Sequence, residues 1–214
     1  MIYLDHAASS HPKAPGVAEA VLRALTQVGA NPGRSGHRLS AEAAGLIFEA
    51  REVIAQVLGV ADSRRVLLGS GCTWALNAAL HGHLRHGDHV VCSPMEHNSV
   101  MRPLRALERS LGLSLEVAQA DSHGRLRPGA LRALCRPETR LAVVNHASNV
   151  NGVLQNLRAI RKEIPATPLL VDAAQTVGAV PIDVDGSDID FLAFSGHKGL
   201  LGPKGTGGLA LGPG

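Results

Sequence analysis

Short aliphatic runs alternate along this chain with longer stretches in which apolar residues recur every three to four positions. Aliphatic runs of this kind are typical of strands buried on both faces of a parallel sheet, and the longer spacing is that of helices. Strand and helix in alternation favour an α/β fold with a mostly parallel sheet. We predict seven strands, at residues 65–68, 89–92, 113–117, 140–144, 168–171, 190–194 and 208–211.

Helical spacing is clearest between the early strands. Residues 73–84 carry Leu76, Leu80 and Leu84 on one face, and residues 99–111 end before Gly112, a residue that commonly stops a helix. Ser40 is placed to cap a further helix that ends at Gly59. Shorter helices are expected at 128–135 and 156–164.

The first part of the chain is dense in Gly, Pro, Ser and His, residues that favour turns and loops. We therefore predict an irregular N-terminal segment at 1–39, followed by one large domain at 40–214. The 214 residues suffice for such a domain, and a 45% hydrophobic content with only 2% aromatic residues indicates a core of Ala, Val, Leu and Ile.

Charge and terminal patterns exclude several functional classes. The net charge of +3 comes from scattered arginines without base-stacking aromatics, which argues against a nucleic-acid partner. The first residues, MIYLDHAASS, do not form a signal peptide, and no apolar stretch has the length of a membrane span. We expect a cytoplasmic protein without a membrane partner.

Cysteine and histidine spacings do not indicate a metal. Cys72, Cys92 and Cys135 lie far apart and form no CxxC pair, so a disulfide framework and a zinc site are not expected. The histidines between 81 and 89 also lack the i, i+4 spacing by which a helix presents two ligands.

A glycine-rich turn follows the first predicted strand. In Gly69-Ser-Gly-Cys-Thr73 the glycines allow close approach of a ligand, and the next helix offers free N–H groups to a phosphate. An ordinary strand-to-helix turn is an equally good interpretation of this segment alone. Trp74 stands where a dinucleotide fingerprint needs its third glycine, which disfavours a nicotinamide-binding domain.

Charged residues follow two later strands. Asp172 ends an apolar strand, where a carboxylate is costly to bury unless it meets a cation such as a protonated pyridine nitrogen. A loop salt bridge or a helix cap would also account for it. Lys198 lies between the strand at 190–194 and a Gly-rich run, an unlikely position for a surface lysine, and a desolvated amine there is a usable nucleophile.

Two further polar residues follow strands. His97, in Glu96-His97-Asn98, presents a planar ring that can stack on a planar cofactor, although a lone histidine after a strand is more often a capped or solvated residue. Asn149 lies in the loop after the strand at 140–144. In an open α/β sheet, ligands bind outside the carboxyl ends of the strands, so we expect these residues to gather there.

Together these motifs resemble the class V pyridoxal-phosphate (PLP) enzymes of the fold type I group, and among them the NifS/SufS-type cysteine desulfurases. The most specific element is the combination of Asp172-x-x-Gln175 with Ser195-x-His-Lys198. The other matching segments are Tyr3-Leu-Asp5, Asn31-Pro…Gly36-His37, Gly71-Cys-Thr73, Glu96-His97 and His146-Ala-Ser-Asn149.

The resemblance implies a fold type I large domain, with a seven-stranded, mainly parallel sheet covered by helices on both faces. It implies that Lys198 forms a Schiff base with PLP and moves the substrate Cα proton. Asp172 would hold the ring nitrogen protonated, Gln175 would bond the ring hydroxyl, His97 would stack on the ring and assist proton transfer, and Asn149 would lie near the ring oxygen. The implied phosphate-binding residues are Gly71, Cys72, Thr73, Ser195 and His197.

By the same resemblance the substrate is an amino acid, L-cysteine, which yields alanine while its sulfur passes to an acceptor protein. Family members are homodimers. Their persulfide cysteine and carboxylate-binding arginine lie in a C-terminal region, so we expect the small C-terminal domain to be absent here. Cys72, Trp74, His6 and Gly199 depart from the common pattern. Three alternatives therefore stay open: a non-catalytic PLP-binding fragment, a transaminase and a selenocysteine lyase.

Overall fold

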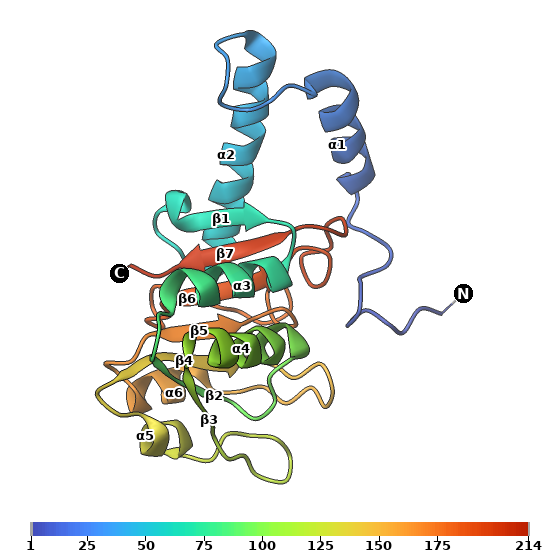
Figure 1. Ribbon diagram of the computed structural model, residues 1–214. Coiled ribbons are helices and arrows are strands. Elements are labelled where there is room, and N and C mark those ends of the chain that lie inside the picture. Colours follow the sequence, from blue (N-terminus) through green and yellow to red (C-terminus); the bar gives the residue numbers. More distant parts are fainter. Residues whose placement is uncertain (1, 214) are drawn as a thin grey trace.

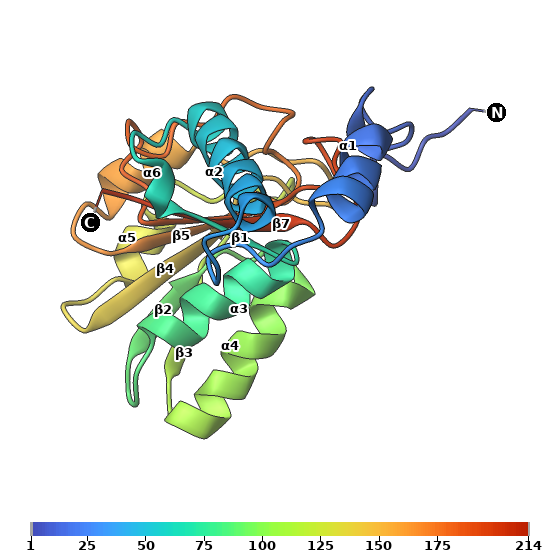
Figure 2. The same ribbon diagram turned by 90° about the horizontal axis from the view of Figure 1, so that it is seen from above.

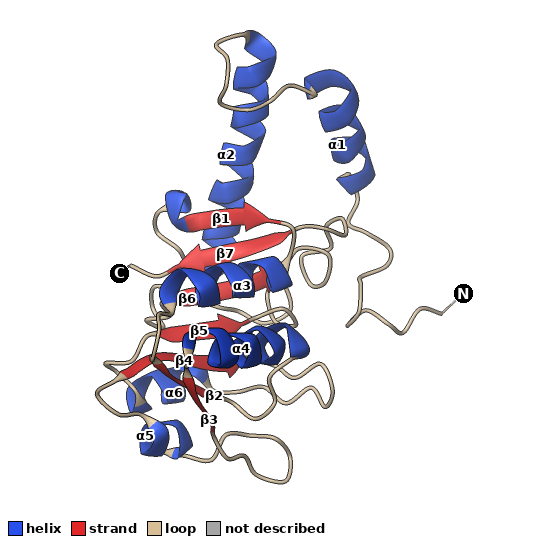
Figure 3. Ribbon diagram, viewed as in Figure 1, coloured by secondary structure: helices blue, strands red, loops and turns tan. Residues whose placement is uncertain are grey.

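The structure is a computed structural model that describes residues 2–213. Within them, seven strands form one sheet in the order β1-β7-β6-β5-β4-β2-β3 (Figures 1 and 3). β7 pairs antiparallel with β1 and β6, and the other pairings are parallel. The expected seven-stranded, mainly parallel sheet is confirmed. The strands are β1 (Val66–Gly69), β2 (His89–Cys92), β3 (Ser114–Val117), β4 (Thr139–Asn145), β5 (Leu169–Asp172), β6 (Phe191–Ser195) and β7 (Gly207–Leu211).

Helices cover both faces of the sheet, as predicted. Figure 2 shows α3 and α4 on one side and α2, α5 and α6 on the other. Within residues 2–213 no helix combines the length and the apolar character that crossing a membrane requires. The bounds are α2 (Arg38–Leu58), α3 (Cys72–His83), α4 (Asn98–Leu111), α5 (Ala130–Leu134) and α6 (Leu157–Glu163).

Each face of the sheet has its own hydrophobic core. Because successive side chains of a strand point to opposite faces, Val90 and Cys92 pack against α3 and α4, while Val91 packs with the opposite cluster. All three are fully buried. The aliphatic runs of the sequence are thus strands sandwiched between two helix layers, which leaves the strand ends as the accessible edge.

The N-terminal segment differs from the prediction of an irregular 1–39. It contains α1 (Val17–Arg23) and the π-helical η1 (Ala24–Val28), and α2 already begins at Arg38. The segment VAEAVLR consists of residues that favour helices. The turn-forming residues on either side of it led to the prediction of an irregular segment. In Figure 1, α1 and α2 project beyond the β1 edge of the sheet.

Two predicted helix boundaries were also wrong. His37, not Ser40, caps α2, because the His37 Nδ1 atom accepts a hydrogen bond from the Ser40 backbone N–H at 3.2 Å. The helix predicted at 128–135 is shortened to α5 because Gly129 takes a left-handed conformation with φ 77°.

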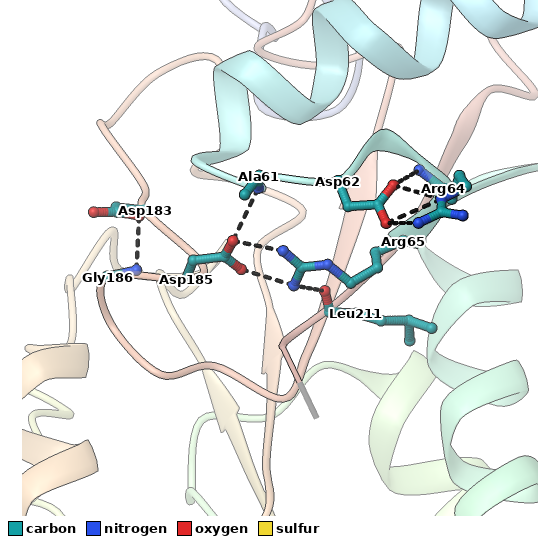
Figure 4. Close-up of polar contacts among 8 residues, drawn as sticks. All are labelled: Ala61, Asp62, Arg64, Arg65, Asp183, Asp185, Gly186 and Leu211. Atoms are coloured by element: carbon teal, nitrogen blue, oxygen red, sulfur yellow. Dashed lines mark hydrogen bonds and ion pairs between the residues drawn. The ribbon is translucent and has the colours of Figure 1, made fainter.

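An ion pair fastens the β1 edge to the loop before β6 (Figure 4). Arg65 bonds both carboxylate oxygens of Asp185, at 2.8 and 2.5 Å, and also the Leu211 carbonyl at the end of β7. The Ala61 N–H donates to the same carboxylate at 2.9 Å. The pKa of Asp185 is lowered, first by the Arg65 hydrogen bonds. This contact joins residues 120 positions apart.

Candidate active site

A cavity of about 500 Å³ lies at the carboxyl ends of the parallel strands. All the site residues predicted from the sequence line it, which brings together residues from the turn before α3, the start of α4, and the ends of β5 and β6. These residues are Gly71, Cys72, Thr73, His97, Asn149, Asp172, Gln175, Ser195, His197 and Lys198.

The turn before α3 and the first residues of that helix line the cavity. Gly71 has φ 132°, a conformation that favours glycine, and the N-terminus of α3 has no side-chain cap. The turn rests closely on β7, since a Cβ atom at Gly207 would lie 2.7 Å from the Gly71 Cα atom. The uncapped N–H groups and the helix dipole favour an anion at this end of the cavity.

Asp172 is a buried carboxylate at the end of β5, with 2% of its surface exposed. Its Oδ1 atom accepts hydrogen bonds from the Ala174 N–H at 3.0 Å and from the Cys72 thiol at 3.3 Å. Within residues 2–213 no Lys, Arg or His forms an ion pair with it. A buried carboxylate without a cationic partner is suited to receive a cation from a ligand.

Lys198 follows β6 on a turn that the N-terminal segment holds in place. The His197 carbonyl, directly before Lys198, accepts hydrogen bonds from the Ser10 N–H, the Ser10 hydroxyl and the Lys13 amine, at 3.0, 3.0 and 3.2 Å. Lys198 is half-buried, and its own amine makes no hydrogen bond within residues 2–213. The turn is therefore held by its backbone while the Lys198 amine stays free for a ligand.

His197 lies in a positively charged part of the cavity. Its ring is 3.2 Å from the Ser195 hydroxyl. Burial lowers the pKa of His197, and the charges of Lys198, Lys13 and Lys204 lower it further. A neutral imidazole among several ammonium groups indicates a place where an anion would be stabilised.

His97 and Gln175 form parts of the wall. His97 is exposed and caps α4, because its Nδ1 atom accepts from the Ser99 N–H at 3.1 Å. This capped, exposed state is one of the alternatives considered from the sequence, and it leaves the ring lining the cavity. The Gln175 amide donates to the Ala7 carbonyl at 3.1 Å and so holds the N-terminal segment against the site.

Several wall residues were not predicted individually. Asp5, named from the sequence only as part of a matching segment, lines the cavity together with Ala7 and Ala8, and Asn145 lines it because β4 extends one residue beyond the predicted strand. A polar residue directly after an aliphatic run was the available signal for Asn145. Ser70, Ser99 and Ala174 complete the lining.

Two of the histidines near residue 85 make polar contacts within the protein. His89 is buried and bonds Thr139 and Glu116 at 2.8 and 3.2 Å, and the His83 ring lies 3.1 Å from the Arg140 carbonyl oxygen. Across residues 2–213, no three His, Cys, Asp or Glu side chains are grouped so that they could hold a metal ion.

Solved structures share this fold over nearly the whole chain. The apo structure of cysteine desulfurase from Thermococcus onnurineus NA1 superposes with a TM-score of 0.90 at 33% identity, over 99% of this chain and 54% of that one. A structure described as SspA in complex with cysteine gives a TM-score of 0.91 at 31% identity, over 99% and 61%. The fold is therefore that of the fold type I large domain.

Curated relatives point the same way. The cysteine desulfurases IscS of Serratia proteamaculans and Tolumonas auensis are 37% and 38% identical over 216 aligned residues, which cover 97% of this chain and 52% of each relative. The chain thus spans about half the length of these relatives. Residues 2–212 match the aminotransferase class-V family. The chain therefore belongs to the aminotransferase class-V family.

Proposed function

We propose that this chain is the PLP-binding part of a cysteine desulfurase-like enzyme, which converts L-cysteine to alanine and passes on the sulfur. The observation that carries the proposal is one cavity lined by an unbonded lysine amine, a buried carboxylate without a cation and an uncapped helix N-terminus. The names of the relatives and of the cysteine-bound structure support the substrate.

The residues of the cavity fit PLP at its two charged ends. A protonated ring nitrogen would give Asp172 the cation that it lacks, and a phosphate group would meet the N-terminus of α3 with Thr73, Ser195 and His197. Gly71 and Cys72 would present backbone N–H groups to the same phosphate. When bound, PLP supplies an electron sink for the negative charge that develops at the substrate Cα atom.

Lys198 and Asp172 carry the central roles in this proposal. The Lys198 amine would hold PLP through its aldehyde group and would take the proton from the substrate Cα atom. The Asp172 carboxylate would hold the proton at the ring nitrogen, because the two donors on its Oδ1 atom orient the carboxylate. We assign Lys198 and His97 as the catalytic residues.

The remaining wall residues would orient the ring. The His97 imidazole would stack on the ring and assist proton transfer, and Gln175 would turn its amide toward the ring hydroxyl. Asn149 would lie near the ring oxygen and the substrate. The N-terminal segment, held by Lys13, would limit the access of water on one side.

Partners and location follow the family resemblance. We propose a homodimer, a sulfur-acceptor protein and a cytoplasmic location. In family members a cysteine thiolate attacks the substrate sulfur, the bond from Cβ to sulfur breaks, and Cβ takes up a proton. In family members that cysteine and the carboxylate-binding arginine lie in a C-terminal region, and this chain spans about half the length of its curated relatives.

PLP binding is the first test. The purified protein is titrated with PLP while the visible absorbance of lysine-bound PLP is recorded, and borohydride reduction followed by mass spectrometry identifies the modified lysine. We expect Lys198 to be modified, the signal to vanish in Lys198→Ala, and Lys162→Ala to behave as the unchanged protein. A Lys198→Ala variant that keeps the absorbance contradicts the proposal.

Turnover separates the alternatives. The PLP-loaded protein is incubated with L-cysteine, L-selenocysteine or an amino donor with a keto acid, and the products are quantified. Alanine with sulfide or protein-bound sulfur supports the desulfurase. Alanine from selenocysteine alone identifies a selenocysteine lyase, keto-acid exchange identifies a transaminase, and PLP binding without product identifies a non-catalytic PLP-binding fragment.

A further inference from the structure

The Glu96 carboxyl group joins two strand ends beside the cavity. Its Oε1 atom accepts a hydrogen bond from the Ser93 hydroxyl at 2.5 Å and one from the Asn145 N–H at 2.6 Å. Ser93 directly follows β2, and Asn145 is the last residue of β4. His97, which lines the cavity and caps α4, is the next residue along the chain.

The pairing of β2 with β4 ends before the last residue of β4, which leaves a backbone N–H that this carboxyl group can bond. β2 pairs with β4 as far as Cys92 opposite Val143, and the Ser93 N–H still bonds the Val143 carbonyl at 3.0 Å. β4 continues to Asn145, where it pairs with Asp172 of β5 on its other side. The Asn145 N–H therefore loses its strand partner, and Glu96 satisfies it.

We propose that Glu96 is a positioning residue of this site: its carboxyl group fixes the segment that carries His97 to the end of β4. The assignment rests on the proposed function for the identity of the cofactor. The fixed segment forms the part of the cavity wall that carries His97, and Asn145 anchors that wall next to Asp172. Loss of the carboxyl group would free both ends of this connection.

The protonated, uncharged form of the Glu96 carboxyl group suits its buried position. The Oε2 atom of Glu96 is fully buried and has no hydrogen-bond partner within residues 2–213. Burial raises the pKa of Glu96 to about 8, and the charge of Asp172 acts in the same direction, while the bonds from Ser93 and Asn145 oppose the rise. At neutral pH Glu96 is protonated, so a second buried negative charge beside Asp172 is avoided.

The surrounding titratable groups are consistent with this state. Asp172 faces Glu96 from β5, and Cys92 faces it from β2. Burial raises the pKa of Cys92 to about 12, and Glu96 contributes to the rise, so the thiol stays neutral over the same range. Of these two neighbours, therefore, Asp172 is the one whose charge acts on Glu96.

Three variants test the assignment. Glu96→Gln keeps an oxygen that accepts both hydrogen bonds and cannot ionise, whereas Glu96→Ala removes the connection. Glu108→Gln is the matched control, because it neutralises a carboxylate of α4 that forms a surface pair with Arg105. The readouts are the dissociation constant of PLP, the induced circular dichroism of bound PLP, and the amide proton signal of Asn145 in the PLP-free protein.

At pH 7 we expect Glu96→Gln and Glu108→Gln to match the unchanged protein, and Glu96→Ala to bind PLP roughly tenfold more weakly with altered dichroism. The Asn145 amide signal should persist in Glu96→Gln and shift upfield in Glu96→Ala. Equal impairment of Glu96→Gln and Glu96→Ala overturns the neutral-acid role. A Glu96→Ala variant that matches the unchanged protein in all three readouts overturns the positioning role.

The PLP-free protein also gives a test through pH. Since the folded-state pKa of Glu96 is raised, the stability that its proton provides is lost as pH rises through about 8. The free energy of unfolding should fall relative to Glu96→Gln as pH rises from the ordinary pKa of 4.5 to about 8 and level off above it, and a constant difference contradicts the assignment. The Asn145 signal and this readout both apply even if PLP fails to bind, and this readout needs only the unchanged protein and Glu96→Gln if Glu96→Ala does not fold.

Discussion

The Cys72 thiol donates a hydrogen bond to the Oδ1 atom of Asp172, with 3.3 Å between sulfur and oxygen. Burial raises the pKa of Cys72 well above its ordinary value, and the charge of Asp172 adds to the rise. The thiol is therefore a neutral donor to the carboxylate, in a cavity where a thiolate would be a nucleophile. Its position supports a role in orienting Asp172 and argues against a role in accepting sulfur.

Thiol reactivity provides the first prediction. Cys72 and Cys92 are buried, whereas Cys135 is half-buried, so alkylation of the PLP-free native protein by iodoacetamide at pH 8 should modify Cys135 first. Mass spectrometry of peptides taken over time measures the order. In urea all three cysteines should react at similar rates, which controls for the chemistry of the reagent. Native alkylation of Cys72 as fast as Cys135 would contradict the neutral, buried thiol.

Gly178 provides a prediction about the turn that carries Lys198. A Cβ atom at Gly178 would lie 2.4 Å from the Gly199 carbonyl carbon, and Gly178 has φ 83°. Gly178→Ala should therefore displace the turn after Lys198, lower the free energy of unfolding by about 2 kcal/mol or more, and weaken PLP binding. Urea denaturation and PLP titration measure the two effects.

Gly45 is the matched control for that substitution. It lies inside α2, and a Cβ atom there meets no atom within 4 Å. Gly45→Ala should stabilise the protein by about 0.5–1 kcal/mol and leave PLP binding unchanged. If both alanine variants are equally stable, the close approach of Gly178 to Gly199 does not constrain the turn.

The buried position of His146 indicates that the protein loses stability in acid. It is buried after β4, its Nδ1 atom lies 2.9 Å from the Thr176 hydroxyl, and burial lowers its pKa to about 4. Between pH 6.5, the ordinary pKa of histidine, and about pH 4, the unfolded chain therefore binds more protons than the folded chain does. The free energy of unfolding should fall over that window by up to about 3 kcal/mol.

Comparison with His146→Asn isolates this contribution, because the other titrating groups remain in both proteins. Urea denaturation at a series of pH values from about 4 to about 7.5 gives the two curves. The stability difference between them should be largest at neutral pH and should narrow toward pH 4. Parallel curves would mean that His146 does not carry the predicted proton linkage.

Arg65 predicts a difference between two neighbouring ion pairs (Figure 4). Its pair with Asp185 is largely buried, with 19% and 25% of the side chains exposed, whereas Arg64 in its pair with Asp62 is 86% exposed. Arg65→Met should lower the free energy of unfolding by about 1–3 kcal/mol, whereas Arg64→Met should leave it nearly unchanged because water screens the exposed pair. Urea denaturation measures both variants, and a loss for Arg64→Met as large as that for Arg65→Met would contradict the distinction.

Much of the fold was predictable because the signal is local. The strand at 89–92 matched β2 in full, and Gly59 and Gly112 ended their helices as expected, with φ 64° and 63°. α1 was missed because it buries none of its residues, so no core-facing pattern distinguished it from the turn formers around it. The predicted site residues all line one cavity, and their individual roles stay predictions.

The sequence by itself determined the alternation of strands and helices, since burial on a strand or helix leaves a periodic trace in neighbouring residues. It also carried the family motifs. Only the tertiary structure decided the contacts between Cys72 and Asp172, between Glu96 and Asn145, and between Lys13 and the His197 carbonyl. These partners lie 100, 49 and 184 positions apart, and what brings them together is the order of strands in the sheet, a long-range property that no local pattern encodes.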